Sequence, residues 1–174
     1  VQRGKTICGD YIGGVIAQAL EMGESNACMK CIVAAPTAGS CGVLPAVLLP
    51  YQQREGLSDE AMVRAMYVAG AIGQVVAAKA SIAGAAGGCQ AEIGTARAMG
   101  AAALCYLGGG AAPAVWPAAA IALKNLLGLI CAPVAGPVEI PCIKRNAVGV
   151  SNAFAAADMA LAGIASRIPP DAVV

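Results

Sequence analysis

The sequence contains no histidine. This absence removes the commonest general base of enzymes and the commonest nitrogen ligand of protein metal sites. Any metal must therefore be held mainly by thiolate groups, and sets of thiolates favour zinc or an iron–sulfur cluster. Such groups are plentiful, because the 174 residues include eight cysteines.

Charged and aromatic residues are also scarce, at 12% and 3% of the chain, and the net charge is +1. Nucleic-acid binding is not expected, since there is neither a basic surface for phosphates nor an aromatic platform for bases. Apolar residues reach 59%, above the usual share in soluble domains. A chain of this kind buries part of its outer surface against another polypeptide, or lies in a membrane.

A membrane span is not expected, although the longest uncharged run, residues 98–123, is long enough to cross a bilayer. The run contains a triple glycine and two prolines, and consists mostly of alanine rather than the leucine, isoleucine and phenylalanine that favour insertion. Lysine and arginine are scattered, without the loop asymmetry of membrane proteins. Residues 1–15 do not have the pattern of a signal peptide, so we expect a cytoplasmic protein.

No segment alternates between apolar and polar residues as a half-buried strand does. Alanine and glycine recur instead at spacings of three and four, which lets helices approach closely. The sequence therefore predicts an all-α fold, an Ala/Gly-rich bundle forming one domain over 1–174, with tails at 1–9 and 168–174. Asp10 is the expected N-cap of the first helix, and Gly23 its expected end. Helices are predicted over residues 10–22, 25–33, 43–54, 58–79, 90–107, 113–127 and 147–164.

The stretch from 131 to 146 is different, because prolines stand at positions 133, 137 and 141. Each proline fixes φ and removes a backbone donor, so we expect a rigid, non-helical loop. The loop contains Cys131 and Cys142, and Lys144 and Arg145 follow directly. Two thiols on such a loop between helices suggest a site.

Three cysteines, Cys89, Cys131 and Cys142, each lie at a predicted helix boundary beside glycine or proline, where backbone amides can donate to thiolates or cluster sulfurs. Three thiolates would leave one metal position open, as a Lewis-acid catalyst requires. Lys144 and Arg145 would offset the negative charge of such a cluster or hold a substrate carboxylate.

Cys28 and Cys31 form a single CxxC, and on one helix their sulfurs would share a face. No second CxxC completes a zinc site, and no thioredoxin-like context surrounds this one. Packing is the alternative for these thiols, as it is for Cys8 and Cys105. A loop of small residues at 34–42 precedes an apolar helix, and such loops bring backbone amides close to an anion.

Several segments together carry a resemblance that covers nearly the whole chain: VAAPTAGSCG at 33–42, GAIGQVVA at 70–77, ASIAGAAGGCQAEIGTARAMGAAAL at 80–104, CAPVAGPVEIPCIKRNAVG at 131–149 and DMALAGIASRIP near the end. With these motifs the chain resembles the α module of the iron–sulfur-dependent L-serine dehydratases, or L-serine ammonia-lyases.

The resemblance implies an oxygen-sensitive [4Fe–4S] cluster held by Cys89, Cys131 and Cys142. In that family the uncoordinated iron binds the hydroxyl of L-serine and makes it a leaving group. Removal of the α-proton then gives aminoacrylate, which decays to pyruvate and ammonia without pyridoxal phosphate, a reaction of amino-acid degradation and gluconeogenesis. The candidates for binding the substrate carboxylate are Thr37, Gly39, Ser40 and Asn146.

The family also has a β module, fused or separate, with a Ser/His-containing motif that this chain lacks. The catalytic base is therefore expected on a partner chain. Two family acids are missing beside proposed ligands, since Ala86 and Ala132 stand in their places, and Pro137 and Lys30 also depart from the usual pattern. Loss of such groups costs about 10–100-fold in metal affinity or activity. The alternatives are a non-catalytic, degenerate or membrane-associated helical subunit whose cysteines only pack, and a related hydro-lyase for another hydroxy acid.

Overall fold

The computed structural model describes residues 6–130 and 139–174, and gives only the backbone for 139–141. These ranges contain helices and connecting turns but no strand, so the all-α prediction is confirmed. In chain order the elements are α1 (Gly9–Ala27), the 3₁₀ turn η1 (Ala38–Ser40), α2 (Val43–Glu55), α3 (Asp59–Lys79), α4 (Gly84–Cys89), the π-helical turn η2 (Gln90–Gly94), α5 (Thr95–Leu107), α6 (Ala112–Asn125), α7 (Glu139–Leu161) and α8 (Pro170–Val173).

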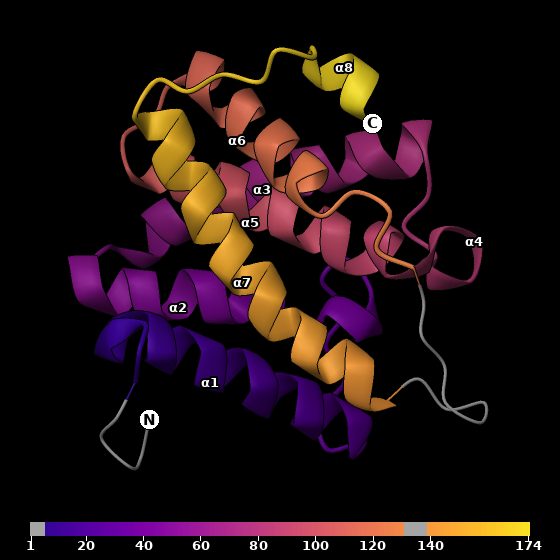
Figure 1. Cartoon of the computed structure of the whole chain (residues 1–174). Helices are drawn as coiled ribbons and strands as arrows, with labels where there is room; N and C mark the ends of the chain where they lie inside the picture. The colour runs from indigo at the N-terminus through magenta and orange to yellow at the C-terminus, as the bar shows by residue number, and fades with distance from the viewer. Residues whose placement is uncertain (1–5, 131–138) are drawn as a thin grey trace.

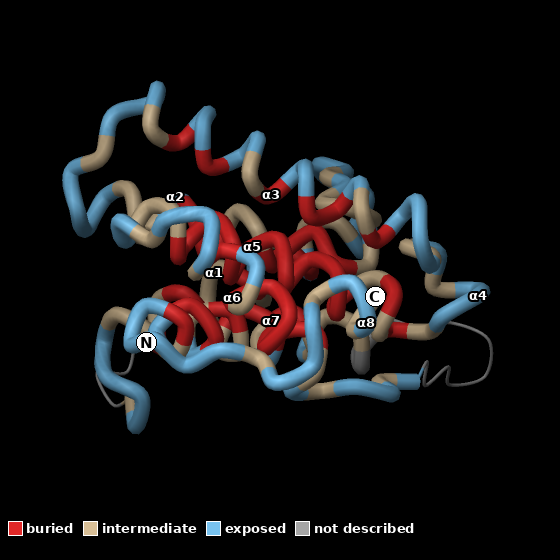
Figure 2. Tube along the Cα trace, turned by 90° about the horizontal axis from the view of Figure 1, so that it is seen from above, coloured by how far each residue is buried: buried red, intermediate tan, exposed pale blue. Residues whose placement is uncertain are grey.

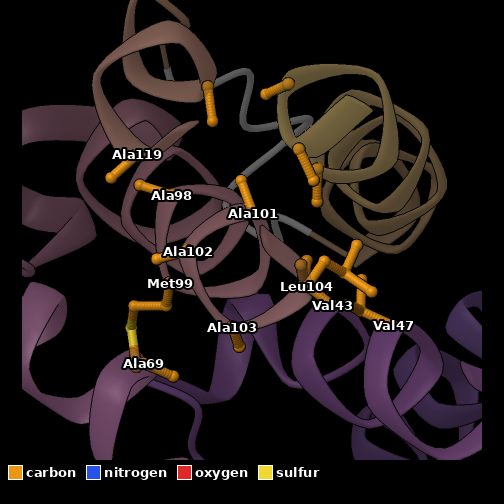
Figure 3. Packing of buried hydrophobic residues seen from close by; sticks show 14 of the residues in the cluster. Val43, Val47, Ala69, Ala98, Met99, Ala101, Ala102, Ala103, Leu104 and Ala119 are labelled. Carbon is orange, nitrogen blue, oxygen red and sulfur yellow. The ribbon is translucent and has the colours of Figure 1, made fainter. Parts of the chain in front are cut away.

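Helix α5 lies at the centre of the bundle, and α2, α3, α6 and α7 pack around it (Figure 1). Every residue of α5 from Thr95 to Cys105 is buried, and the buried part of the chain forms the middle of the molecule in Figure 2. Five of these eleven residues are alanine and one is glycine, so neighbouring helix backbones can lie close to α5. Figure 3 shows the longer Met99 of α5 reaching towards Ala69 of α3.

Glycine allows the closest of these helix contacts. At Gly73 of α3, an added Cβ would lie 2.9 Å from the sulfur of Met99 on α5. Such a contact is shorter than packed atoms tolerate, so a larger residue here would require the Met99 side chain to move. The small residues of the sequence therefore set the helix spacing, as predicted from their periodicity.

The uncharged run at 98–123 is divided between α5 and α6, which pack against each other around the turn at 108–111. Within the described part of the chain, one helix is long and apolar enough to cross a membrane, namely α3. One face of α3 packs on α5, whereas Val63, Met66 and Tyr67 on its other face are exposed.

Two predicted boundaries of the first helix are wrong. Asp10 does not cap α1, which begins at Gly9 with Cys8 in the N-cap position and no side-chain cap bond. Gly23 does not end it, because Gly23 is buried under α7, where an added Cβ would lie 3.3 Å from the Ile143 side chain. The glycine serves helix packing rather than helix termination.

The predicted helix at 25–33 is also wrong. Residues 25–27 belong to α1, and the chain then turns at Met29, which has a φ of 58°. Cys28 is the C-cap of α1 and Cys31 lies beyond the turn, so the two thiols do not share a helix face. The remaining boundaries of α2 and α3 agree with prediction to within one residue, and Ser58 caps α3 by accepting from the amide of Ala61.

The last long helix begins eight residues before the predicted start at 147, at Glu139. Pro141 is its third residue, within the first turn, where a backbone N–H has no intrahelical acceptor and proline costs nothing. Cys142, Lys144, Arg145 and Asn146 therefore lie on α7 and not on a loop. Cys131 and the prolines at 133 and 137 lie outside the described residues.

Two further segments are more regular than predicted. The glycine-rich connection at 84–88 forms α4, and residues 90–94 form a π-helical turn before α5. The C-terminal segment expected as a tail contains α8, which contacts α6, and Val173 and Val174 pack against the core.

Candidate metal centre

Two of the three predicted metal-binding cysteines lie together. The sulfurs of Cys89, at the end of α4, and Cys142, in the first turn of α7, are 3.8 Å apart. These residues are 53 positions apart in the sequence. Cys89 is buried, with 1% of its surface exposed, and Cys142 is half-buried. The third, Cys131, lies outside the described residues, which contain no group of three metal-ligating side chains.

The chain leading to Cys131 is held beside this pair of thiols. The backbone amide of Gln90 donates to the carbonyl of Leu129 at 2.8 Å. One guanidinium nitrogen of Arg145 donates both to the sulfur of Cys89 and to the carbonyl of Ile130, each at 2.7 Å. The residue directly before Cys131 is therefore joined to Cys89 through a single arginine.

The backbone at Cys89 explains how its thiol is presented. Gly88 has φ 62° and ψ −157°, a conformation that an L-residue rarely adopts, and it interrupts the helix just before the cysteine. The π-helical turn then follows, and such turns occur frequently at functional sites. Because glycine bends the chain here, Cys89 faces the start of α7 rather than continuing the face of α4.

The residues present fit a thiolate-bound iron–sulfur cluster. Two sulfurs from separate elements converge, and Arg145 supplies a cationic hydrogen-bond donor of the kind that stabilises sulfur ligands. Their separation is far longer than a disulfide bond of about 2.0 Å. Soft sulfur donors without nitrogen ligands are characteristic of zinc and iron–sulfur sites.

The loop from Thr37 to Gly42 lies next to this pair of thiols, but its polar side chains are engaged within the protein. Ser40 has 0% of its surface exposed, and its hydroxyl accepts from the amide of Thr37 and lies 3.2 Å from the carbonyl of Ala35. Gly39 is half-buried and lines a cavity. The structure thus brings the predicted loop residues together, with Ser40 supporting the loop from inside.

Glu92 is a site residue that the sequence analysis missed. Its carboxylate accepts a 2.7 Å hydrogen bond from the hydroxyl of Thr37. Its second oxygen lies so close to Gly39 and Gly84 that a Cβ on either would be 2.7 Å away. Glu92 is the sole charged residue between positions 79 and 97, three residues after the predicted ligand Cys89, and this isolated charge could have signalled it.

Asn146, predicted as a substrate contact, is 1% exposed and bonds to backbone on every side. Its side-chain oxygen accepts from the amide of Gly42 at 2.9 Å. Its nitrogen donates to the carbonyls of Gly39 at 3.0 Å and Cys142 at 2.9 Å. The amide therefore joins the loop to the first turn of α7, with its hydrogen-bonding capacity used inside the protein.

A cavity of about 290 Å³ lies between the loop, the end of α1 and the start of α7. Its volume is at the lower limit for sites that bind small molecules. The residues that line it are Gly23, Asn26, Ala27, Ala38, Gly39, Cys41, Cys142, Ile143 and Asn146. A small ligand bound there would touch both the loop and a predicted metal ligand.

The remaining thiols divide into buried and exposed ones. Cys41 lines the cavity and Cys105 lies in the core, and burial raises the pKa of both thiols, which keeps them protonated at neutral pH. The prediction that Cys105 packs is confirmed by its place in the core. Cys28 and Cys31 are exposed. Cys8 is exposed too, so the expectation that it packs in the core is wrong.

A buried arginine bonds to Gln90, the residue after Cys89. Arg97 on α5 is 0% exposed, and it donates to the side-chain oxygen of Gln90 and to the carbonyl of Leu123. Two of its nitrogens, Nε and Nη1, have no hydrogen-bond partner among the described residues. Burial lowers the pKa of Arg97 to about 10. Within the described residues no acidic side chain pairs with this charge, and its bond to Gln90 connects it to the residue after Cys89.

Helical architecture, converging thiols and a small-residue loop together define an α-helical protein with a cysteine-based candidate metal site. The profile of the family described as serine dehydratase alpha chain matches residues 1–174, and the chain belongs to this family.

Individual relatives agree with the family. The chain is 52% identical over 174 residues to a probable L-serine dehydratase, alpha chain, of Bacillus subtilis (strain 168), covering 100% of this chain and 58% of the relative. It is 47% identical over 171 residues to the L-serine dehydratase, alpha chain, of Peptoniphilus asaccharolyticus, covering 98% and 59%. It is 46% identical over 158 residues to L-serine dehydratase 1 of Escherichia coli (strain K12), covering 90% and 35%. The chain thus spans less than two thirds of the length of these relatives.

Proposed function

We propose that this chain is the cluster-bearing α part of an L-serine dehydratase, which converts L-serine to pyruvate and ammonia. The family and the names of the relatives support this assignment. The observation that carries it is the convergence of Cys89 and Cys142, the second of which lines a cavity together with Ala38 and Gly39 of the loop at 37–42.

We assign Cys89, Cys131 and Cys142 as the ligands of a [4Fe–4S] cluster. When bound by three cysteines, such a cluster supplies an iron with an open coordination position, which acts as a Lewis acid towards a substrate hydroxyl. Arg145 holds Cys89 and the segment before Cys131 together and contributes positive charge beside the sulfur ligands. The buried position of Cys89 limits access of bulk water to this part of the site.

The substrate carboxylate is assigned to the backbone of the loop. The hydroxyl of Ser40 and the amide of Gly42 are engaged within the protein, whereas Ala38 and Gly39 line the cavity. Backbone amides at such a turn bind anions without a counter-ion side chain. Thr37 then shapes the loop through its bond to Glu92 rather than touching the substrate itself.

The proton of the substrate must be removed by a group from a second polypeptide or module. The chain has no histidine, and within its described part the cavity is lined by no aspartate, glutamate or lysine side chain. A β module that completes the site would also cover the exposed Met29, Ile32 and Ile130, which flank the loop and the pair of thiols. We place the assembled enzyme in the cytoplasm.

Anaerobic reconstitution with iron and sulfide tests this function. We expect a broad visible iron–sulfur absorption, lost in Cys89→Ser, Cys131→Ser and Cys142→Ser. The control Cys28→Ser changes an exposed thiol and should keep the cluster. With the β module present, the loaded chain should convert L-serine to pyruvate faster than it dehydrates L-threonine or small hydroxy acids, with each substrate's own product measured. A wild-type chain that binds no iron would establish the non-catalytic alternative, and a preference for a hydroxy acid would establish a related hydro-lyase.

A further inference from the structure

Two side chains hold the loop at 37–42 from opposite directions, and each belongs to an element that carries a predicted cluster ligand. Glu92 follows Cys89 by three residues, in the π-helical turn that begins directly after it. Asn146 follows Cys142 by four residues, one turn further along α7. Glu92 thus connects the loop to the turn that follows Cys89, and Asn146 connects it to the first turn of α7, which contains Cys142.

The contact from Glu92 involves a carboxylate that is closely packed against the loop backbone. Its carboxylate accepts from Thr37 at 2.7 Å, a distance typical of a strong charge-assisted hydrogen bond. The other oxygen fits between the backbones at Gly39 and Gly84, where no side chain larger than glycine leaves room. A shift of the turn after Cys89 therefore moves the loop directly.

The contact from Asn146 is neutral and fully buried. It bonds the loop at Gly42 and Gly39 and, with the same amide group, the carbonyl of Cys142. A buried amide that loses these partners leaves polar groups unsatisfied, so the connection is held firmly. A shift of the first turn of α7 is passed to the other end of the loop.

The two sulfurs are 3.8 Å apart, close to van der Waals contact. Binding of a cluster between Cys89 and Cys142 must therefore displace at least one of the two thiols. We propose that Glu92 and Asn146 are positioning residues that transmit this displacement to the loop at 37–42, so that the substrate cavity takes its final shape only when the cluster is bound. This inference rests on the function proposed above, and it assigns Glu92 a role that the chemistry of the ligands alone does not.

The test compares Glu92→Ala with Glu92→Gln, because the glutamine oxygen can still accept from Thr37. Glu60→Ala, on the exposed face of α3, is the control. Amide hydrogen exchange at residues 38–42 is measured in cluster-free and reconstituted protein, with iron content, circular dichroism and thermal melting as checks. In the wild type we expect slower exchange at these amides once the cluster is bound.

Glu92→Ala should abolish that slowing while keeping at least half of the iron, and with the β module its KM for L-serine should rise about tenfold with a smaller change in kcat. Glu92→Gln and the control should behave as the wild type. Asn146→Ala should raise exchange at Gly42 in the same way, and if this buried variant does not fold, the Glu92 pair decides alone.

The inference would be overturned if Glu92→Ala showed the same exchange at 38–42 and the same KM for L-serine as the wild type. It would also be overturned if exchange at 38–42 in the wild type did not differ with and without the cluster. A wild-type chain that binds no cluster refutes the proposed function instead. In that case, faster exchange at 38–42 in cluster-free Glu92→Ala than in cluster-free Glu92→Gln would still show that the hydrogen bond to Thr37 holds the loop. It would not show that the cluster changes the loop.

Discussion

Replacing Arg97 with methionine should stabilise the chain, because this arginine is a buried charge with no counter-ion among the described residues. It is fully buried, and within the described part of the chain it takes part in none of the ion pairs. Burial lowers its pKa well below the ordinary arginine value, to about 10. At about 1.4 kcal/mol for each unit of pKa, the charged form costs the folded state about 3 kcal/mol at neutral pH.

The substitution also removes two hydrogen bonds, each worth about 1 kcal/mol. The carbonyl of Leu123 keeps a donor, since the side-chain nitrogen of Gln90 also bonds to it at 3.1 Å. The net effect of Arg97→Met is therefore a gain of about 1 kcal/mol in the free energy of unfolding, in line with other replacements of buried charges by apolar side chains of similar volume.

Urea unfolding at pH 7, followed by circular dichroism, measures this gain. Arg64→Met removes an exposed arginine of α3 and should change stability by less than about 0.5 kcal/mol. Because the folded-state pKa lies below the unfolded-state value, the charge penalty is complete below pH 10 and is relieved as the pH rises above it. The advantage of the methionine variant should thus shrink above pH 10. A decrease of about 1 kcal/mol or more in the free energy of unfolding of Arg97→Met at pH 7 would refute this reasoning, because it would mean that the lost hydrogen bonds outweigh the relieved charge.

Two further substitutions test the site and the loop. Arg145→Met should reduce the iron retained after reconstitution about tenfold, because the bridge from Cys89 to the segment before Cys131 is lost. Lys144→Met, which removes the neighbouring exposed cation, should retain wild-type iron content. Equal losses of iron in both variants would mean that the loss of positive charge, and not the loss of the Arg145 hydrogen bonds, causes the effect. Gly42→Ala should lower the free energy of unfolding by about 1–3 kcal/mol, since the new Cβ would lie 2.4 Å from the carbonyl of Ala19. An unchanged melting temperature would contradict that expectation.

The helical class and the spans of α2 and α3 could be predicted because local signals fix them. Ser58 caps α3, and Gly56 ends α2 in the left-handed conformation, with φ 62°. The start of α7 was predicted wrongly because proline was taken to exclude a helix, although the first turn accepts it. The predicted end of α1 at Gly23 was wrong for a related reason. In the sequence, a glycine that ends a helix cannot be distinguished from one that makes room for a neighbouring helix.

The candidate site could be predicted where cysteine identified it, but not where long-range contacts define it. Cys89 and Cys142 converge across 53 positions as expected, whereas the bond between Thr37 and Glu92 spans 55 positions without a motif of its own. For Asn146 the sequence indicated proximity to the site. Its bonds to three backbone groups, which support a positioning role over a substrate contact, depend on how α7 packs on the loop.

The alanine-lined surface of α5 has a consequence for how this protein can change over time. Each buried alanine contributes little on its own, and removing its single methyl group leaves almost no void. Enlarging one, in contrast, presses on the neighbouring helix backbone at once, because no flexible side chain lies between them. The central helix should therefore tolerate losses of volume better than gains. New properties would then arise mainly on the outer faces, such as the exposed side of α3, while the spacing of the helices that hold the two thiols stays fixed.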